Sequence, residues 1–166
     1  MATRQNAKLV SAVQEAAGQP LDQSLLLSLV GYNCRRAYLT IIPHFEERMK
    51  KFELRAVDFS VLSILSANPN ITQKRLSKAV NVSPPNLAIL LDKLEERGLL
   101  VRQRNPLDKR SQTLVLTAEG AKLCAKAEKT VAELELEATS MLSTSERTEL
   151  VKLLQKIFLR EDQAEA

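Results

Sequence analysis

The stretch VRQRNPLDKRSQTLVLTAEG, residues 101–120, decides the fold. Apolar residues 99–101 stand at its start and apolar residues 114–116 lie near its end. The turn signal Asn105-Pro106 lies between these two apolar runs. Two short apolar runs on either side of such a signal predict a β-hairpin. One acid, Asp108, lies among the cations of this hairpin, which are Arg102, Arg104, Lys109 and Arg110. The predicted hairpin therefore has a basic tip.

Two helices joined by a tight turn are predicted directly before the hairpin. Thr72 caps the first, over residues 73–80, and Asn81-Val82 form the turn. Ser83 caps the second, Pro84 fits its first position, and Gly98 ends it. The buried stripe of this second helix is Leu87, Leu90, Leu91 and Leu94. A helix, a turn, a helix and a basic hairpin form the layout of a winged helix-turn-helix.

Longer helices flank this middle part. Apolar residues recur at helical spacing over residues 22–52, with a kink or break expected at 38–42 because Pro43 removes a helical hydrogen bond. A helix over 56–67 follows, and Thr117 caps one that extends to Met141. Ser143 and Glu146 form a capping box for the last helix. The fold class is mainly α with a small β-hairpin.

The chain divides into three expected parts. Residues 1–20 form a mobile arm, residues 21–54 and 118–166 are dimerisation helices, and residues 55–117 are the winged helix-turn-helix lobe. A helix at a chain end cannot bury an apolar stripe alone, so packing against a second copy in a two-fold dimer is favoured. The alternative is an intrachain bundle in which both ends fold back on the middle.

The composition indicates a polyanionic partner. The net charge is +4, yet the residues from Thr117 onward carry seven Lys/Arg and ten Asp/Glu, so the excess of cations lies before them. The alternative is that these cations only solvate helices. Cys34 and Cys124 are the only cysteines, so no metal site, disulfide framework or cofactor is expected. With no apolar run of membrane length and no signal-peptide pattern, we expect no membrane contact and a cytoplasmic protein.

The N-terminal part of the second helix is expected to enter the major groove of double-stranded DNA. Asn86 suits an adenine edge, or alternatively caps the helix. Pro85, Ala88 and Ile89 offer apolar contact to a thymine methyl, and Lys93 reaches a phosphate. The full set of helix residues predicted at the DNA is Ser83, Pro84, Pro85, Asn86, Ala88, Ile89 and Lys93.

The hairpin is expected to contact the strand beside that groove. Arg110 inserts into the minor groove, and Asp108 orients it through a charge-assisted bond. Arg102, Arg104 and Lys109 bind phosphates. The alternative is a solvated hairpin with surface charge.

These segments resemble the MarR family of bacterial transcription regulators. The matching segments are LSKA (76–79), VS (82–83), LDKLEERGL (91–99), RNPLDKR (104–110) and LTAEG (116–120), within residues 56–123. The resemblance implies a homodimer, usually a repressor, that covers a palindromic promoter site and is released by a small ligand, often an aromatic acid or phenol. Ala88, Ile89 and the Pro84-Pro85 pair depart from the family pattern, which bears on the operator sequence.

The resemblance also indicates where an effector binds. Arg35 or Arg36 would hold a carboxylate, and Tyr38 or His44 would meet a phenol. The basic surface would also suit the phosphates of an aromatic acyl-CoA. The candidate effector residues are Tyr32, Arg35, Arg36, Tyr38, His44 and Phe59. The alternative for each is helix-surface or interface packing.

Two other functions have less support in the sequence. Cys34 would serve a redox-sensing regulator of the same fold, but it lies on the apolar stripe, which favours a buried, inert thiol. Catalysis is not expected, because the chain has one histidine, no glycine-rich phosphate loop and no nucleophile elbow.

Overall fold

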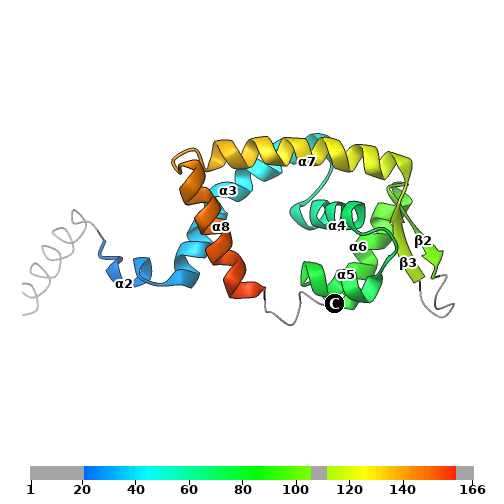
Figure 1. The fold of residues 1–166 in the computed structure, drawn as a ribbon, viewed down its shortest axis with the longest axis horizontal. Helices are drawn as coiled ribbons and strands as arrows, with labels where there is room; N and C mark the ends of the chain where they lie inside the picture. The colour runs from blue at the N-terminus through cyan, green and yellow to red at the C-terminus, as the bar shows by residue number, and fades with distance from the viewer. Residues whose placement is uncertain (1–20, 106–111, 160–166) are drawn as a thin grey trace, which may run out of the picture. The chain divides into compact units, whose positions relative to one another are not determined.

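A computed structural model describes residues 21–105 and 112–159 (Figure 1). The chain divides into two compact units between Tyr38 and Leu39, and each is described by itself. The predicted arm at residues 1–20 and the hairpin tip with Asp108, Lys109 and Arg110 lie outside the described residues. The expectations for these segments stay predictions.

The first helices differ from the sequence expectation in two places. Helix α2 (Ser24–Leu27) ends before α3 (Val30–Met49), so residues 22–52 are not one helix. Helix α3 runs through Pro43, so of the kink or break predicted near 38–42 the break is wrong and the kink stays a prediction. One proline costs the helix a single backbone hydrogen bond, and burial of Phe45 and Met49 in the next turns favours continuation. The short 3-10 helix η1 (Lys50–Phe52) follows directly.

The middle of the chain forms the predicted helix-turn-helix. Helices α4 (Ala56–Ala67), α5 (Gln73–Val80) and α6 (Pro84–Glu96) match the expected ranges within a residue. The Thr72 hydroxyl accepts a hydrogen bond from the Arg75 N–H at 3.4 Å, as a cap does. Asn81, with φ 51°, makes the tight turn between α5 and α6. Gly98, with φ 68°, ends α6 as predicted, because a glycine adopts this conformation without strain.

The hairpin consists of β2 (Leu100–Arg104) and β3 (Gln112–Leu116), which pair antiparallel with Leu100 opposite Leu116. A third strand, β1 (Ile71–Thr72), was not predicted, because two residues are too short to show alternation. It pairs with the other edge of β3, so the sheet order is β1-β3-β2. The start of α5 is thereby tied to the hairpin.

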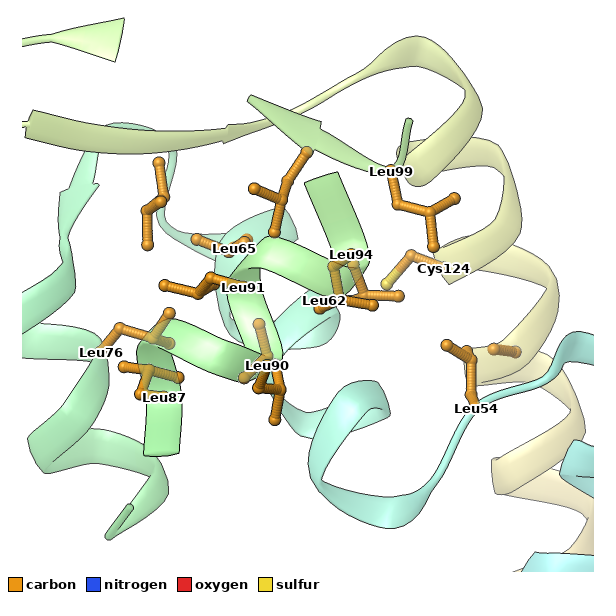
Figure 2. Close-up of a cluster of buried hydrophobic side chains, with 14 of the residues drawn as sticks. Leu54, Leu62, Leu65, Leu76, Leu87, Leu90, Leu91, Leu94, Leu99 and Cys124 are labelled. Atoms are coloured by element: carbon orange, nitrogen blue, oxygen red, sulfur yellow. The ribbon is translucent and has the colours of Figure 1, made fainter. Parts of the chain in front are cut away.

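Leucines from the three helices and the hairpin of this lobe form most of its core. Leu62 and Leu65 of α4, Leu76 of α5 and the four leucines of α6 are buried together (Figure 2). Cys124 of α7 (Ala118–Ala138) lies at the edge of the same cluster. This packing fixes α6 from one side and leaves its other side exposed.

The two last helices begin as predicted. Thr117 accepts a capping hydrogen bond from Gly120 N–H, and Ser143 with Glu146 forms a capping box at α8 (Thr144–Phe158). Helix α7 ends at Ala138, three residues earlier than expected. Helix α8 buries none of its residues against the rest of the described chain. Its exposed apolar side chains are Leu150, Val151, Leu153, Ile157 and Phe158.

Candidate DNA-binding interface

Helix α6 has one buried face and one exposed face. Leu87, Leu90, Leu91 and Leu94 are at most 5% exposed. Ile89, on the other face, is 57% exposed. The exposed members of the predicted DNA-contact set are Ser83, Pro84, Pro85, Asn86, Ile89 and Lys93, and Ala88 is half-buried. The structure therefore brings these residues onto one surface.

The first turn of α6 suits an anionic partner. Ser83 occupies the N-cap position, but its hydroxyl makes no capping hydrogen bond, contrary to the expectation from sequence. No acidic residue lies in this turn. Asn86 is at the third helical position and exposed. Pro84 and Pro85 have no amide N–H to offer, so the feature that favours a phosphate at this end is the positive end of the helix dipole.

Helix α5 adds cations that were not among the predicted DNA contacts. Lys74, Arg75 and Lys78 are exposed on this short helix, which packs against α6. The sequence feature that could have identified these cations is the basic composition of the first helix of the helix-turn-helix, QKRLSKAV. In such motifs the first helix crosses the DNA backbone, so cations there reach phosphates.

Arg102 at the base of the hairpin has partners on α6. Its guanidinium forms ion pairs with Asp92, at 2.6 Å, and with Glu95. Its backbone N–H also donates to the Glu95 carboxylate at 3.1 Å. The arrangement fastens the hairpin to α6, a role that sequence spacing did not indicate. The phosphate contact expected of Arg102 stays a prediction, as does that of Arg104, which is exposed at the end of β2.

The predicted effector residues belong to both units. In the first unit, half-buried Tyr32 donates a hydrogen bond to the Gln23 side chain at 3.2 Å, and Arg35, Arg36 and Tyr38 are exposed. In the second unit His44 is exposed. Phe59 packs edge-on against Phe45, with ring centroids 5.9 Å apart, which agrees with the packing alternative for this residue.

The two cysteines have different surroundings. Cys34 is partly buried, whereas Cys124 lies in the core. Burial, together with the charge of Glu128, raises the pKa of the Cys124 thiol to about 12, so this thiol stays protonated and inert at neutral pH. Across residues 21–105 and 112–159, no three potential metal-ligating side chains gather in one place. Nor does any helix there have the length and apolar character to cross a membrane.

Helix α6 has an exposed face, the basic helix α5 precedes it, and a β-hairpin follows it. This arrangement is a winged helix-turn-helix, a fold typical of DNA-binding proteins. The MarR family model matches residues 54–112, which span α4 to the start of β3. The transcriptional repressor CouR, bound to a 23-mer DNA duplex, is 36% identical with a TM-score of 0.78, over 84% of this chain and 99% of that chain.

Other relatives agree. MarR from E. coli is 28% identical with a TM-score of 0.68, over 79% of this chain and 98% of that chain. A protein of Thauera aromatica, proposed as a transcriptional regulatory protein for the hcr operon, is 26% identical over 82% of this chain and 83% of its own length. The chain belongs to the MarR family. It is therefore a DNA-binding transcriptional regulator and not an enzyme, as the sequence predicted.

Proposed function

We propose that this protein is a homodimeric repressor that covers a palindromic promoter site and leaves it when an aromatic acyl-CoA binds. The observation that carries the DNA-binding part is the exposed face of α6, where Asn86 and Ile89 stand on a helix whose other face is fixed in the core. A rigidly held helix with exposed side chains near its N-terminus is what base reading in the major groove requires.

Helix α8 supports the homodimer. Its apolar residues Leu153, Ile157 and Phe158 are between 48% and 63% exposed, although they lie at the spacing of a buried stripe. A second copy buries this surface without any further partner, and a two-fold axis also places two recognition helices on one duplex. Half-sites of such a dimer lie about 34–36 Å apart.

The effector class rests on relatives and on charge. CouR, 34% identical in its complex with p-coumaroyl-CoA, is one relative whose ligand is an aromatic thioester. In this chain Arg35 and Arg36 are exposed on α3, where guanidinium groups suit the phosphates of coenzyme A. An aromatic acid without coenzyme A is the alternative within the same function.

The DNA-binding part is tested by fluorescence anisotropy with the protein's own upstream DNA. We expect an inverted repeat to bind tightly, a scrambled duplex about 1,000-fold more weakly, and the logarithm of the affinity to fall linearly with the logarithm of the salt concentration. Equal binding to both duplexes would refute the proposal.

The effector part is tested by adding p-coumaroyl-CoA, p-coumarate or coenzyme A to the bound operator. Release by the thioester alone supports an acyl-CoA effector, and release by the acid assigns the alternative. Release by peroxide that disappears in Cys34→Ser would instead support the redox-sensing regulator.

A further inference from the structure

The C-terminal end of α6 is held by hydrogen bonds to two other elements. On one side, Arg97, the C-cap residue, donates from its guanidinium to the carbonyl oxygens of Glu53 at 2.7 Å and Phe52 at 2.9 Å. The Glu53 carboxylate lies 3.8 Å from the same guanidinium. These carbonyls belong to the end of η1 and the left-handed residue after it, where the continuous α3–η1 segment turns into α4.

On the other side, the start of α7 holds the residues that follow Arg97. The Thr117 hydroxyl donates to the Gly98 carbonyl at 2.6 Å, and the Thr117 N–H donates to the Leu99 carbonyl at 3.1 Å. Gly120 packs so closely that a Cβ there would lie 1.8 Å from the Leu99 oxygen. Leu99, directly after the end of α6, is therefore held close to the start of α7.

Arg97 is also close to the start of α4. The buried Asp58 carboxylate accepts hydrogen bonds from the backbone and side chain of Arg55, and the charge of Arg97 stabilises its ionised form. The side chain of Arg97 is 30% exposed, so much of it is shielded from water. A guanidinium in this position bridges α6 to the turn between η1 and α4 through directional bonds, which a lysine cannot reproduce.

Because α6 is long, a small rotation at the contact between Arg97 and the Phe52 and Glu53 carbonyls, here called the joint, gives a larger displacement at the other end of the helix. Its 13 residues span about 20 Å, with Arg97 at one end and the exposed Asn86 and Ile89 near the other. A rotation of about 10° at the joint moves the far end by about 3 Å. Such a displacement is as long as a hydrogen bond, so it is enough to break a contact between a side chain and a base.

We propose that Arg97 is a positioning residue that fixes the angle of α6 to the turn at Phe52 and Glu53 and transmits movements of that turn to the DNA-reading end. The transmission rests on the proposed function, because it requires that binding of the proposed effector moves the turn. The role of Arg97 in fixing the angle of α6 does not depend on the proposed function. Positioning and transmission are therefore measured separately.

The variant is Arg97→Lys, which keeps the charge and loses the paired donors. Arg147 provides a matched control, because its guanidinium also donates to two backbone carbonyls, those of Thr139 and Leu142, but in the turn between α7 and α8. Arg147→Lys therefore removes the same chemistry without touching α6.

The first measurement is the distance between spin labels at Ile89→Cys and Lys129→Cys, on α6 and α7, in a Cys34→Ser background. Cys124 is buried and protonated and needs no replacement. Labelled chains are mixed with an excess of unlabelled chains, so that only distances within one chain are read. We expect a wider distance distribution in Arg97→Lys and an unchanged one in Arg147→Lys. Equal widths in the wild type and Arg97→Lys would overturn the proposal.

The second measurement is the ratio of operator affinities without and with p-coumaroyl-CoA. We expect a ratio of about 5–150 in the wild type and in Arg147→Lys, and below about 3 in Arg97→Lys. An unchanged ratio in Arg97→Lys would overturn the transmission role. A wild type that is not released at all would contradict the proposed effector, while the spin-label distances still decide whether Arg97 positions α6.

Discussion

Helices α6 and α8 carry similar leucine stripes but find different partners. In α6 four leucines are at most 5% exposed, because α4, α5 and the sheet of the same chain cover them. In α8 no residue is buried, and Leu153 and Ile157 are 48% and 63% exposed. The same kind of pattern is therefore buried within the chain in α6, whereas in α8 it is exposed and is the surface that we propose a second copy covers. Each prediction below changes one side of this contrast.

The largest effect is expected where a second copy is needed. Ile157→Glu places a charge in the apolar surface of α8, so we expect a monomer at micromolar concentration and an operator affinity reduced about 100-fold, because the two half-sites no longer bind together. Light scattering and anisotropy measure both. Gln155→Glu adds the same charge on the other side of α8 and should leave the dimer intact. A dimeric Ile157→Glu would contradict the assignment of this surface.

A cavity in the core of α6 comes next. Leu91 is fully buried, so Leu91→Ala should lower the free energy of unfolding by about 3 kcal/mol. In the monomer expected from Ile157→Glu, where no second copy covers α8, Leu153→Ala should lower the free energy of unfolding by less than about 1 kcal/mol. Urea denaturation at one fixed protein concentration compares the two. Equal losses would mean that α8 is packed within its own chain.

Acidic residues at the starts of α4 and α8 allow a comparison of how stability depends on pH. Burial alone would raise the pKa of Asp58, but hydrogen bonds from Arg55 and the charges of Arg55 and Arg97 outweigh it, so the pKa is lowered. This carboxylate therefore contributes stability above about pH 4, which is lost as the pH falls through its lower folded-state pKa. Asp58→Asn should cost about 1 kcal/mol at pH 7 and less in acid.

The control for this titration is Glu146, whose pKa is lowered by hydrogen bonds from Ser143 at the exposed start of α8. Glu146→Gln removes a capping carboxylate that water already surrounds. A loss of stability in Asp58→Asn that does not change between pH 7 and pH 3 would show that the charge of this group plays no part.

The smallest effect concerns the exposed face of α6. Replacing one thymine in a single half-site by deoxyuridine removes one methyl group, which is worth about 0.8 kcal/mol or about fourfold in affinity when fully covered. We expect this loss in the wild type at one position of the half-site and no loss there in Ile89→Ala. If the loss of affinity on replacing a thymine is the same in the wild type and in Ile89→Ala at every position, Ile89 does not contact a thymine methyl group.

Local sequence signals predicted most of the lobe. Helix α4 was predicted at 56–67 and observed there, and the caps at Thr72, Thr117 and Ser143 were found. Capping and turn residues act on the few residues next to them, so their signals are complete in the sequence. The hairpin pairing followed from the same kind of signal, a turn between two apolar runs.

Contacts between distant residues were not predictable in this way. Strand β1 exists because β3, forty residues later, offers it an edge. Arg102 was predicted only as a phosphate contact, and Arg97 only as part of a family-like segment. The partners of these residues, the Asp92 and Glu95 carboxylates and the Phe52 and Glu53 carbonyls, are set by the folded lobe. Pro43 was predicted to kink or break α3, and the break was wrong because tertiary packing of the next turn outweighs one missing hydrogen bond.

The number of chains on one operator duplex tests the central claim most directly. Native mass spectrometry of the protein with a duplex that carries its upstream inverted repeat should give two chains per duplex and no complex with a scrambled duplex of equal length. One chain per duplex, or equal occupancy of the scrambled sequence, would contradict a homodimer that reads DNA through paired α6 helices.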